Sequence, residues 1–379
     1  MTVRHRSPLL EIIDDDSGLS ALGGEWDRLL ADADHPSIFQ SLAWISSWRA
    51  TLGREHRLMI GVARDPDRGG LVGLAPFAVT SRRYGPAQAR VLQMAGSGPA
   101  APDHLDLIVR RGHPHIPAAL WSAVEARRDW DLVDLDGLRH GSHLAGLLLR
   151  RRTDLQSRAT STVCPYLHLP STWEEYEASL GKNLKQNLRR YRRKLDDLSP
   201  GRVVERMVVD ADEVVDTVDR LADLHQQVRT ARGDRGSFAD PAMIDFHRRL
   251  ALRLLEEGRL RMHRLDVDGR IAAAISCFRY DDTVSFYTTG YDPGLSAYGP
   301  GRRLMALAIR SAIGEGAAGF DFLRGDEPYK RSWGAVDRDD QRIRFATGPR
   351  GRLIAQARQA ARPLRLAVTL LRGIRPTRR

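Results

Sequence analysis

A glycine-rich turn in the C-terminal part of the chain offers the clearest site for chemistry. Tyr298 precedes the run Gly299-Pro300-Gly301, and an apolar helix that starts with Arg302 and Arg303 follows. The N-terminus of a helix exposes unpaired backbone N–H groups and the positive end of the helix dipole, so an anion can bind there. Arginines in the first turn oppose that dipole, and their presence indicates an anionic ligand. The turn is therefore predicted to bind a pyrophosphate.

Two common phosphate-binding motifs do not fit this turn. A dinucleotide-binding turn would have a third glycine where Leu304 stands, and a P-loop would need Gly-Lys followed by Ser or Thr, which the sequence does not contain.

Two side chains are candidates for moving a proton. Asp321 alternates with Phe320 and Phe322 in a short strand and points to the opposite face, so it is either a satisfied structural acid or a base with a raised pKa. His225 lies in a helix predicted over 214–229, before a flexible glycine-containing loop. It is either a structural or surface residue or a base that works at neutral pH.

Together these segments resemble the cofactor-binding half of the GNAT acyltransferases, specifically the CelD/BcsL-type acetyltransferases associated with cellulose biosynthesis, which are similar to the FemABX aminoacyltransferases. The match consists of Gly-Tyr-Asp at 290–292, Pro-Gly at 300–301 and the run from Asp321 to Trp333, while Ser296 departs from the pattern. The resemblance implies acetyl-CoA or another acyl-CoA as co-substrate. It also implies an amine or hydroxyl acceptor, which we expect to be a sugar or a cell-envelope or exopolysaccharide precursor.

The resemblance assigns roles to further residues. Tyr329 would be the acid near the leaving thiolate, and Lys330 would bind an anionic acceptor or the cofactor phosphates. The strand over 284–291 would hold the thioester carbonyl through backbone N–H groups, with the cofactor beside Tyr287, Thr288 and Thr289. No Gly-x-Ser-x-Gly or Ser/His/Asp arrangement is evident, which favours direct transfer without an acyl-enzyme. No Cys/His cluster has zinc-site spacing, so no metal is expected.

Composition sets broad limits. The 379 residues, 42% hydrophobic and 28% charged, are enough for about two domains. No apolar run of about 18 residues is present, and a cytoplasmic protein is the expectation. Cys164 and Cys277 lie in apolar surroundings and are expected to be buried, reduced thiols.

The net charge of +11 is concentrated in two places. Residues 350–379 hold nine arginines and no acid, and their apolar residues predict two short helices broken at Pro363. This tail either docks on the body of the protein or contacts an anionic membrane at its inner face; nucleic acid is the least favoured partner. A basic helix over 182–198 is either a solvated face or a surface that guides an anionic acceptor or cofactor.

The chain also repeats a pattern. The strand-turn-strand at 58–79 returns at 260–280. The strand-helix-strand between 105 and 135, with its helix predicted from about 116 to 127, returns between 284 and 323. We therefore predict an α/β (α+β) fold of two tandem GNAT-like halves, each a mixed twisted sheet flanked by helices. The predicted boundaries are 1–160, 161–349 with the cofactor site, and the tail at 350–379. Asp103, His104 and Asp106 either face the cleft between the halves or cap a turn.

Two other functions remain open from the sequence. One is a Fem-like transferase that uses aminoacyl-tRNA, and the other is a scaffold of a polysaccharide synthesis complex without catalysis.

Overall fold

The structure is a computed structural model of the chain and describes residues 7–151, here the N-terminal half, and 160–360, the C-terminal half. Its strands form one mixed sheet in the order β1-β2-β3-β4-β6-β13-β7-β12-β11-β10-β9-β8, with β5 paired to β3. The strands of the N-terminal half are β1 (Leu9–Ile13), β2 (Arg57–Arg64), β3 (Leu71–Tyr84), β4 (Ala87–Met94), β5 (Ile108–Val109) and β6 (Leu132–Arg139). Those of the C-terminal half are β7 (Thr160–His168), β8 (Val203–Met207), β9 (Leu260–Val267), β10 (Arg270–Tyr280), β11 (Thr283–Tyr291), β12 (Gly319–Asp321) and β13 (Val336–Ala346).

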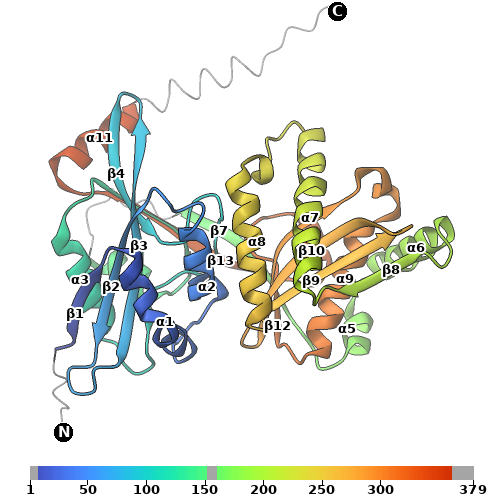
Figure 1. Cartoon of the computed structure of the whole chain (residues 1–379), viewed down its shortest axis with the longest axis horizontal. Coiled ribbons are helices and arrows are strands. Elements are labelled where there is room, and N and C mark those ends of the chain that lie inside the picture. The colour runs from blue at the N-terminus through green and yellow to red at the C-terminus, as the bar shows by residue number, and fades with distance from the viewer. Residues whose placement is uncertain (1–6, 152–159, 361–379) are drawn as a thin grey trace, which may run out of the picture.

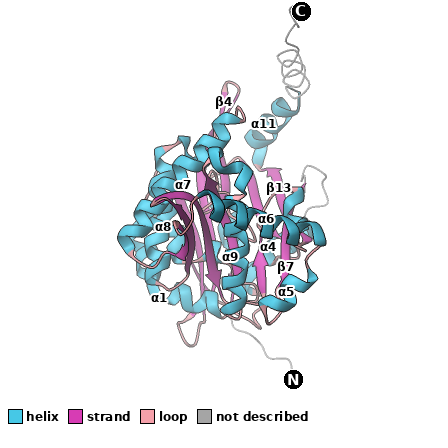
Figure 2. Ribbon diagram, turned by 90° about the vertical axis from the view of Figure 1, so that its right-hand side faces the viewer, coloured by secondary structure: helices cyan, strands magenta, loops and turns pink. Residues whose placement is uncertain are grey.

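Helices cover both faces of the sheet (Figure 1, Figure 2). In the N-terminal half they are α1 (Asp16–Ala31), α2 (Leu42–Arg49), α3 (Ile116–Arg127) and α4 (His143–Arg151), with a 3-10 turn η1 (Ile38–Gln40). In the C-terminal half they are α5 (Trp173–Ser179), α6 (Lys182–Leu198), α7 (Ala211–Ala231), α8 (Pro241–Glu256), α9 (Pro300–Gly314), α10 (Pro328–Ser332) and α11 (Gly348–Ala360), with 3-10 turns η2 (Ser237–Ala239) and η3 (Pro293–Tyr298).

Alternation along β10 separates the two faces of the C-terminal half. Ala273, Ile275 and Cys277 pack in the cluster that contains α9, whereas Ala274 and Phe278 pack in the cluster that contains α7 and α8. The glycine turn at 299–301, where the cofactor is predicted to bind, is called the cofactor turn below. It and α7, the helix that carries His225, therefore lie on opposite faces of the sheet.

β13 joins the two halves, because it lies between β6 and β7 and is antiparallel to both. Each half also contains a parallel pair of strands connected by a helix: β4 with β6 through α3, and β11 with β12 through α9. The predicted fold of two similar α/β halves with a mixed sheet is confirmed.

β11 and β12 separate soon after they meet. Within the described residues they pair only where Thr283–Ser285 meets Gly319–Asp321. Beyond that point the register of β11 against β10 shifts, so that Tyr287 is an extra residue in the strand. Because β12 ends at Asp321, the second half of β11 keeps an edge that β12 does not cover, and it leads directly into η3 and the glycine turn.

The arginine-rich tail begins as a helix that packs on the N-terminal half. In α11, Ile354 is buried with Ala89, Val91 and Leu132, and a Cβ on Gly351 would come within 1.9 Å of the Asp131 carbonyl oxygen. The predicted docking on the body therefore holds for α11. Pro363 and the second predicted helix lie outside the described residues. None of the helices described is both long and apolar enough to span a bilayer.

The contact made by α11 can be tested with two adjacent side chains. Ile354→Ala should lower the free energy of unfolding by about 2 kcal/mol or more, because it leaves a cavity beneath the helix. Leu353→Ala is the matched control, since Leu353 is 68% exposed and its loss should change stability by less than about 0.5 kcal/mol. Urea denaturation measures both, and equal effects would contradict the docking of α11.

Candidate functional site

Gly299 is the residue on which the cofactor turn depends. Its φ of +62° is left-handed, and a Cβ there would lie 2.6 Å from the ring of Tyr191 on α6. Both facts require glycine. Pro300 then occupies the first position of α9, where a missing N–H costs nothing, and no side chain caps the helix. A Cβ on Gly301 would come only within 3.4 Å of Tyr291, so there is room beside this residue. The N–H groups of Arg302 and Arg303 donate to the Gly299 carbonyl at 3.1 and 3.2 Å, whereas among the described residues that of Gly301 has no partner.

The two arginines of the turn differ in their surroundings. The Nη1 of Arg303 lies 2.8 Å from Asp196 of α6, and its Nε binds Glu205 of β8. Arg303 therefore ties α9 to its neighbours and has little charge to offer a ligand. The guanidinium of Arg302 is exposed and lies 5.9 Å from the centre of the Tyr191 ring. Only Arg302 remains a candidate for an anionic ligand.

The side chains of β11 are mostly committed to the protein. The Tyr287 hydroxyl donates to the carbonyl oxygen of Ala100 in the other half at 2.7 Å, and burial raises the pKa of this phenol above its usual range. The hydroxyl of Thr289 donates to the Ala274 carbonyl at 2.9 Å. Thr288 is half-buried and follows the bulge. Tyr287 therefore joins the two halves, and the placement of a cofactor beside these three residues stays a prediction.

His225 lies against the open part of β11. The tight approach of α7 is seen at Gly290, where a Cβ would lie 2.8 Å from the backbone nitrogen of His225. Burial, with Arg229 nearby, lowers the pKa of His225 to about 4, so the imidazole is neutral at pH 7. Its ring meets Phe238 at 5.2 Å, and within the described residues its buried Nδ1 has no hydrogen-bond partner. A neutral imidazole in this place can accept a proton.

Asp321 is the centre of a buried ionic network. Its Oδ1 accepts from the Leu323 backbone at 2.8 Å, and its Oδ2 lies 3.0 Å from His104 Nε2 and 2.5 Å from Arg338 Nη2. Burial would raise the pKa of Asp321, but His104 and Arg338 outweigh it, and the pKa lies below its usual range. Of the two predicted alternatives, a base with a raised pKa is therefore wrong, because hydrogen-bond donors contact both oxygens of Asp321 and its pKa is lowered.

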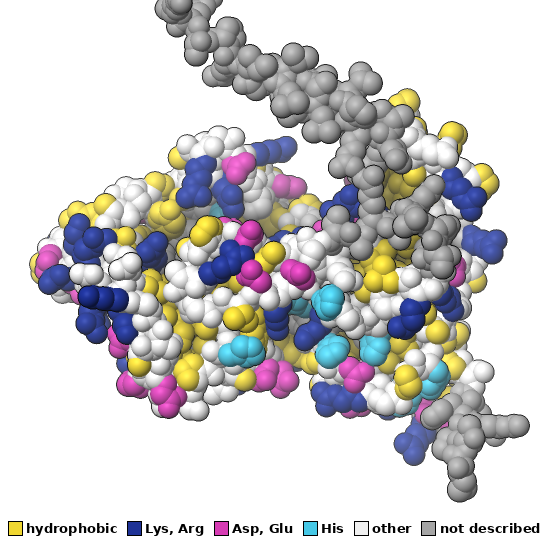
Figure 3. Space-filling model, turned by 180° about the vertical axis from the view of Figure 1, so that it is seen from behind, with side chains coloured by type: hydrophobic (Ala, Val, Ile, Leu, Met, Phe, Trp, Pro, Cys, Tyr) yellow, Lys and Arg dark blue, Asp and Glu magenta, His cyan; other side chains and the backbone are white. Residues whose placement is uncertain are grey.

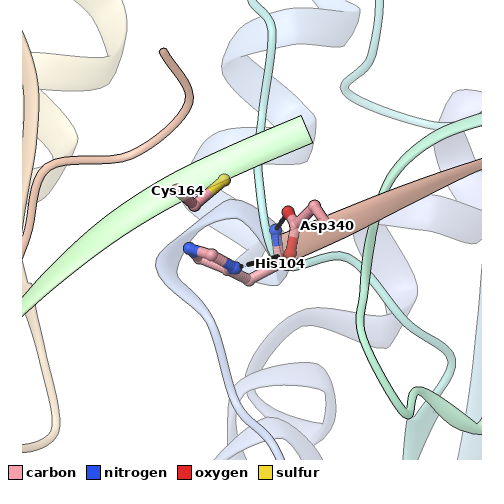
Figure 4. Close-up of side chains that lie close together, drawn as sticks. All are labelled: His104, Cys164 and Asp340. Atoms are coloured by element: carbon pink, nitrogen blue, oxygen red, sulfur yellow. Dashed lines mark hydrogen bonds and ion pairs between the residues drawn. The ribbon is translucent and has the colours of Figure 1, made fainter. Parts of the chain in front are cut away.

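His104 carries the positive charge of this network. Its Nδ1 lies 2.9 Å from Asp340 Oδ1 on β13, and the two carboxylates around the ring raise its pKa although burial opposes them. Cys164 of β7 lies beside this pair (Figure 4), and the donor atoms of His104, Cys164 and Asp340 fall within 4.8 Å of one another. A metal would need a free imidazole lone pair and a thiolate. Here both ring nitrogens face carboxylates, and burial raises the thiol pKa above its usual range.

The loop after β12 is held in shape by hydrogen bonds from the buried side chain of Lys330. The ammonium of Lys330 is 3% exposed and donates to the carbonyl oxygens of Leu323, Arg324 and Gly325 at 2.8–3.2 Å. Lys330 therefore has no free charge for an acceptor or a phosphate, and it shapes the loop instead. Arg324 in turn reaches Asp103 of the other half, with 2.7 Å between Nε and Oδ1.

Tyr329 lies next to Lys330 in α10 and on the α9 side of the sheet. It packs against the apolar cluster that also receives Tyr298. Burial, with a smaller effect from Glu327, raises the pKa of Tyr329 above its usual range, so the phenol keeps its proton. Among the described residues, Tyr329, His225 and Asp321 form no hydrogen bond with one another, so the structure does not assemble the predicted residues into a single triad.

Asp103 and His104 do face the junction of the halves, as predicted in one of the two alternatives. Asp106 instead follows the other alternative, because its carboxylate accepts from the backbone of Leu107, His143 and Leu144. Sequence reasoning missed Asp340, which pairs with His104, and His247 of α8, whose ring stacks on Tyr287 at 5.2 Å. Their signals were a carboxylate within a strand and a histidine on the apolar face of a helix.

Comparison with known proteins agrees with the geometry. Residues 182–331, from α6 to α10, match the acetyltransferase (GNAT) domain family. No curated protein matches the chain. Of the solved structures, FemX has a TM-score of 0.62 at 10% identity, covering 91% of this chain and 100% of FemX. A conserved protein of unknown function from Bacteroides thetaiotaomicron has a TM-score of 0.54 at 13% identity, covering 89% of this chain and 100% of that protein. L-PGS from Bacillus licheniformis has a TM-score of 0.51 at 11% identity, covering 91% of this chain and 96% of L-PGS.

These identities establish a shared fold and not a shared activity. The chain has the overall fold of FemX, and its residues 182–331 are similar to the acetyltransferase (GNAT) domain family.

The buried histidine gives a pH-dependent test. His104→Asn should lower the free energy of unfolding by about 3–5 kcal/mol at pH 6, because it leaves the buried Asp340 without its cation and leaves Asp321 with Arg338 alone. The folded pKa of His104 is raised above its unfolded value of about 6.5, so its stabilising effect is complete below that pH and is lost as the pH rises toward the folded pKa. The difference between the wild type and the variant should therefore shrink from pH 7 to pH 9.

Urea denaturation across this range is the measurement, with His168→Asn as the control because His168 is exposed. A difference that stays constant with pH would contradict the charged state of His104.

Proposed function

We propose that this protein transfers an acyl group from acyl-CoA directly to an amine or hydroxyl acceptor. The observation that carries the proposal is the open N-terminus of α9, preceded by Gly299 and directly continuous with the uncovered edge of β11. A pyrophosphate at the helix N-terminus would accept from the Gly301 N–H and pair with Arg302, and a pantetheine arm would run along the edge of β11 that β12 does not cover. The GNAT match over the same residues supports this use.

The chemistry then divides between the two faces of the sheet. The backbone N–H groups of β11 at the bulge would stabilise the oxyanion that forms on the thioester carbonyl. On the α9 side, the protonated Tyr329 would donate to the departing CoA thiolate. On the α7 side, the neutral His225 would take the proton of the acceptor as its nitrogen or oxygen attacks. The products are the acylated acceptor and free CoA.

For the acceptor, the proposal is a sugar or a cell-envelope or exopolysaccharide precursor, as implied by the resemblance to the CelD/BcsL-type acetyltransferases. The reaction would take place in the cytoplasm, or at the inner face of the membrane if the tail beyond α11 contacts anionic lipid.

The similarity to FemX favours one second candidate, transfer from aminoacyl-tRNA. Equilibrium binding of labelled acetyl-CoA and of aminoacyl-tRNA separates the two. Binding of the tRNA without binding of acetyl-CoA would replace the first proposal.

The cofactor turn can be tested without knowing the acceptor. Gly301→Asp places a side chain and a negative charge at the first turn of α9, where there is room for it, so affinity for acetyl-CoA should fall at least about tenfold, or about 1.4 kcal/mol. Gly314→Asp puts the same charge at the exposed C-terminal end of the same helix and should leave affinity within about twofold. Calorimetry measures both. Equal affinities in the two variants would remove the pyrophosphate assignment.

The assignment of the base is tested once an acceptor is found by screening amines and sugar precursors. His225→Gln should lower kcat by about 10² or more and leave the Kd for acetyl-CoA within about twofold, because the amide keeps polarity but cannot take the proton. Asp321→Asn should act mainly on stability, since its carboxylate is buried in ion pairs. If Asp321→Asn folds with wild-type stability and loses turnover while His225→Gln does not, the base is Asp321.

A further inference from the structure

α6 presents a row of cations on the outside of the C-terminal half. Figure 3 shows Lys and Arg side chains gathered at the end of the molecule that holds α6. Six residues of α6 border one open region of the surface: Lys182, Lys185, Gln186, Arg189, Arg190 and Arg193. Their spacing of three to four residues places them on one side of the helix. We refer to the five cations of this set as the cationic stripe.

The stripe is not neutralised by the protein. Among the described residues, no carboxylate pairs with Arg189, Arg190 or Arg193, and the acid at Asp196 binds Arg303 instead. α8 shows the ordinary arrangement, because its exposed Arg248 and Arg249 each pair with an aspartate. The opposite side of α6 is buried through Leu184 and Leu195, so the stripe is the side that is left for a partner.

One cation of the stripe lies near the cofactor turn. Tyr191, on the buried side of α6, covers Gly299, and Arg190 and Arg302 lie 5.2 and 5.9 Å from the centre of its ring. A ligand at the N-terminus of α9 would therefore have Arg190 near it, whereas the other cations of the stripe face away from the buried side of α6.

The stripe is larger than acyl-CoA requires. Beyond the pyrophosphate, CoA carries one further phosphate of about two negative charges, which Arg302 and Arg190 can neutralise. From Lys182 to Arg193 the stripe extends about 16 Å along the helix. Lys182, Lys185, Arg189 and Arg193 are left over.

We propose that the cationic stripe docks an acidic carrier protein that delivers the acyl group as a thioester on a phosphopantetheine arm. This inference rests on the proposed function, because the arm must enter at the cofactor turn and run along β11 as the arm of CoA would. Carboxylates spaced three to four residues apart on a helix of the partner repeat the spacing of the stripe and match its charge. The arm carries the phosphate that the turn binds.

The transfer itself balances as it does with CoA. The acceptor's nitrogen or oxygen forms the new bond to the acyl carbon, the carbon–sulfur bond breaks, the acceptor loses its proton to the base, and the carrier leaves as a free thiol.

The test compares two donors on the intact protein, using acetyl-CoA and an acetylated bacterial acyl carrier protein as probes. Arg189→Glu with Arg193→Glu should weaken binding of the carrier protein at least about tenfold and leave the Kd for acetyl-CoA within about twofold. Arg68→Glu with Arg83→Glu, at exposed positions in the N-terminal half, is the matched control and should change neither. Binding of the carrier protein should also weaken as salt is raised from 50 to about 300 mM, because exposed charges are screened.

The results distinguish failure of the docking proposal from failure of the proposed acyl-transfer function. If acetyl-CoA binds and the carrier protein does not, the docking proposal is overturned and the proposed function stands. If neither donor binds, the proposed function fails with it. If the carrier protein binds equally to the wild type and to the α6 double variant, the stripe is not its docking surface. Loss of RNA or anionic-vesicle binding in the double variant, with no binding of the carrier protein, would assign the stripe to that partner instead.

Discussion

A protonated histidine held between two buried carboxylates is the interaction on which the architecture of the site depends. His104 comes from the N-terminal half, Asp321 ends β12, and Asp340 lies on the strand that joins the halves. Removing one partner of such a network typically costs about 3–5 kcal/mol, because a buried charge is left alone. Asp321 is the last residue of β12, and beyond it β12 does not cover the second half of β11.

The loop beyond β12 shows how the protein uses charge to hold a shape. Lys330 binds three carbonyl oxygens of its own loop, and Arg324 reaches across to Asp103. Leu323 has a φ of +54°, a conformation that a bulky residue adopts only when its surroundings impose it. These contacts place Tyr329 on the α9 side of the sheet. The same logic applies at the cofactor turn, where Tyr191 packs on Gly299 and Arg303 ties α9 to α6 and β8.

The bounds of helices could be predicted well from the sequence, whereas the residues that pair with the charged side chains could not. The basic helix at 182–198 and the helix within the first repeat at 116–127 have the predicted bounds, because apolar periodicity is a local signal. The pairing of His104 with Asp340 spans 236 residues, and no local pattern indicates that β13 lies between the halves. For the same reason the sequence identified Arg303, Lys330 and Asp321 as charged residues near the site and could not show that other groups already satisfy them. The glycine at position 299 was easier to interpret from the sequence than these charged residues, because the turn before the helix needs a glycine at that point.

The central claim is that the N-terminus of α9 binds the pyrophosphate of an acyl-CoA. A crystal structure of the protein with CoA tests it most directly. Our account predicts phosphate oxygens within about 3 Å of the backbone nitrogen of Gly301, with the pantetheine arm along the uncovered second half of β11. Density for CoA in another place, such as the groove between α3 and α11, with the α9 turn empty, would contradict it.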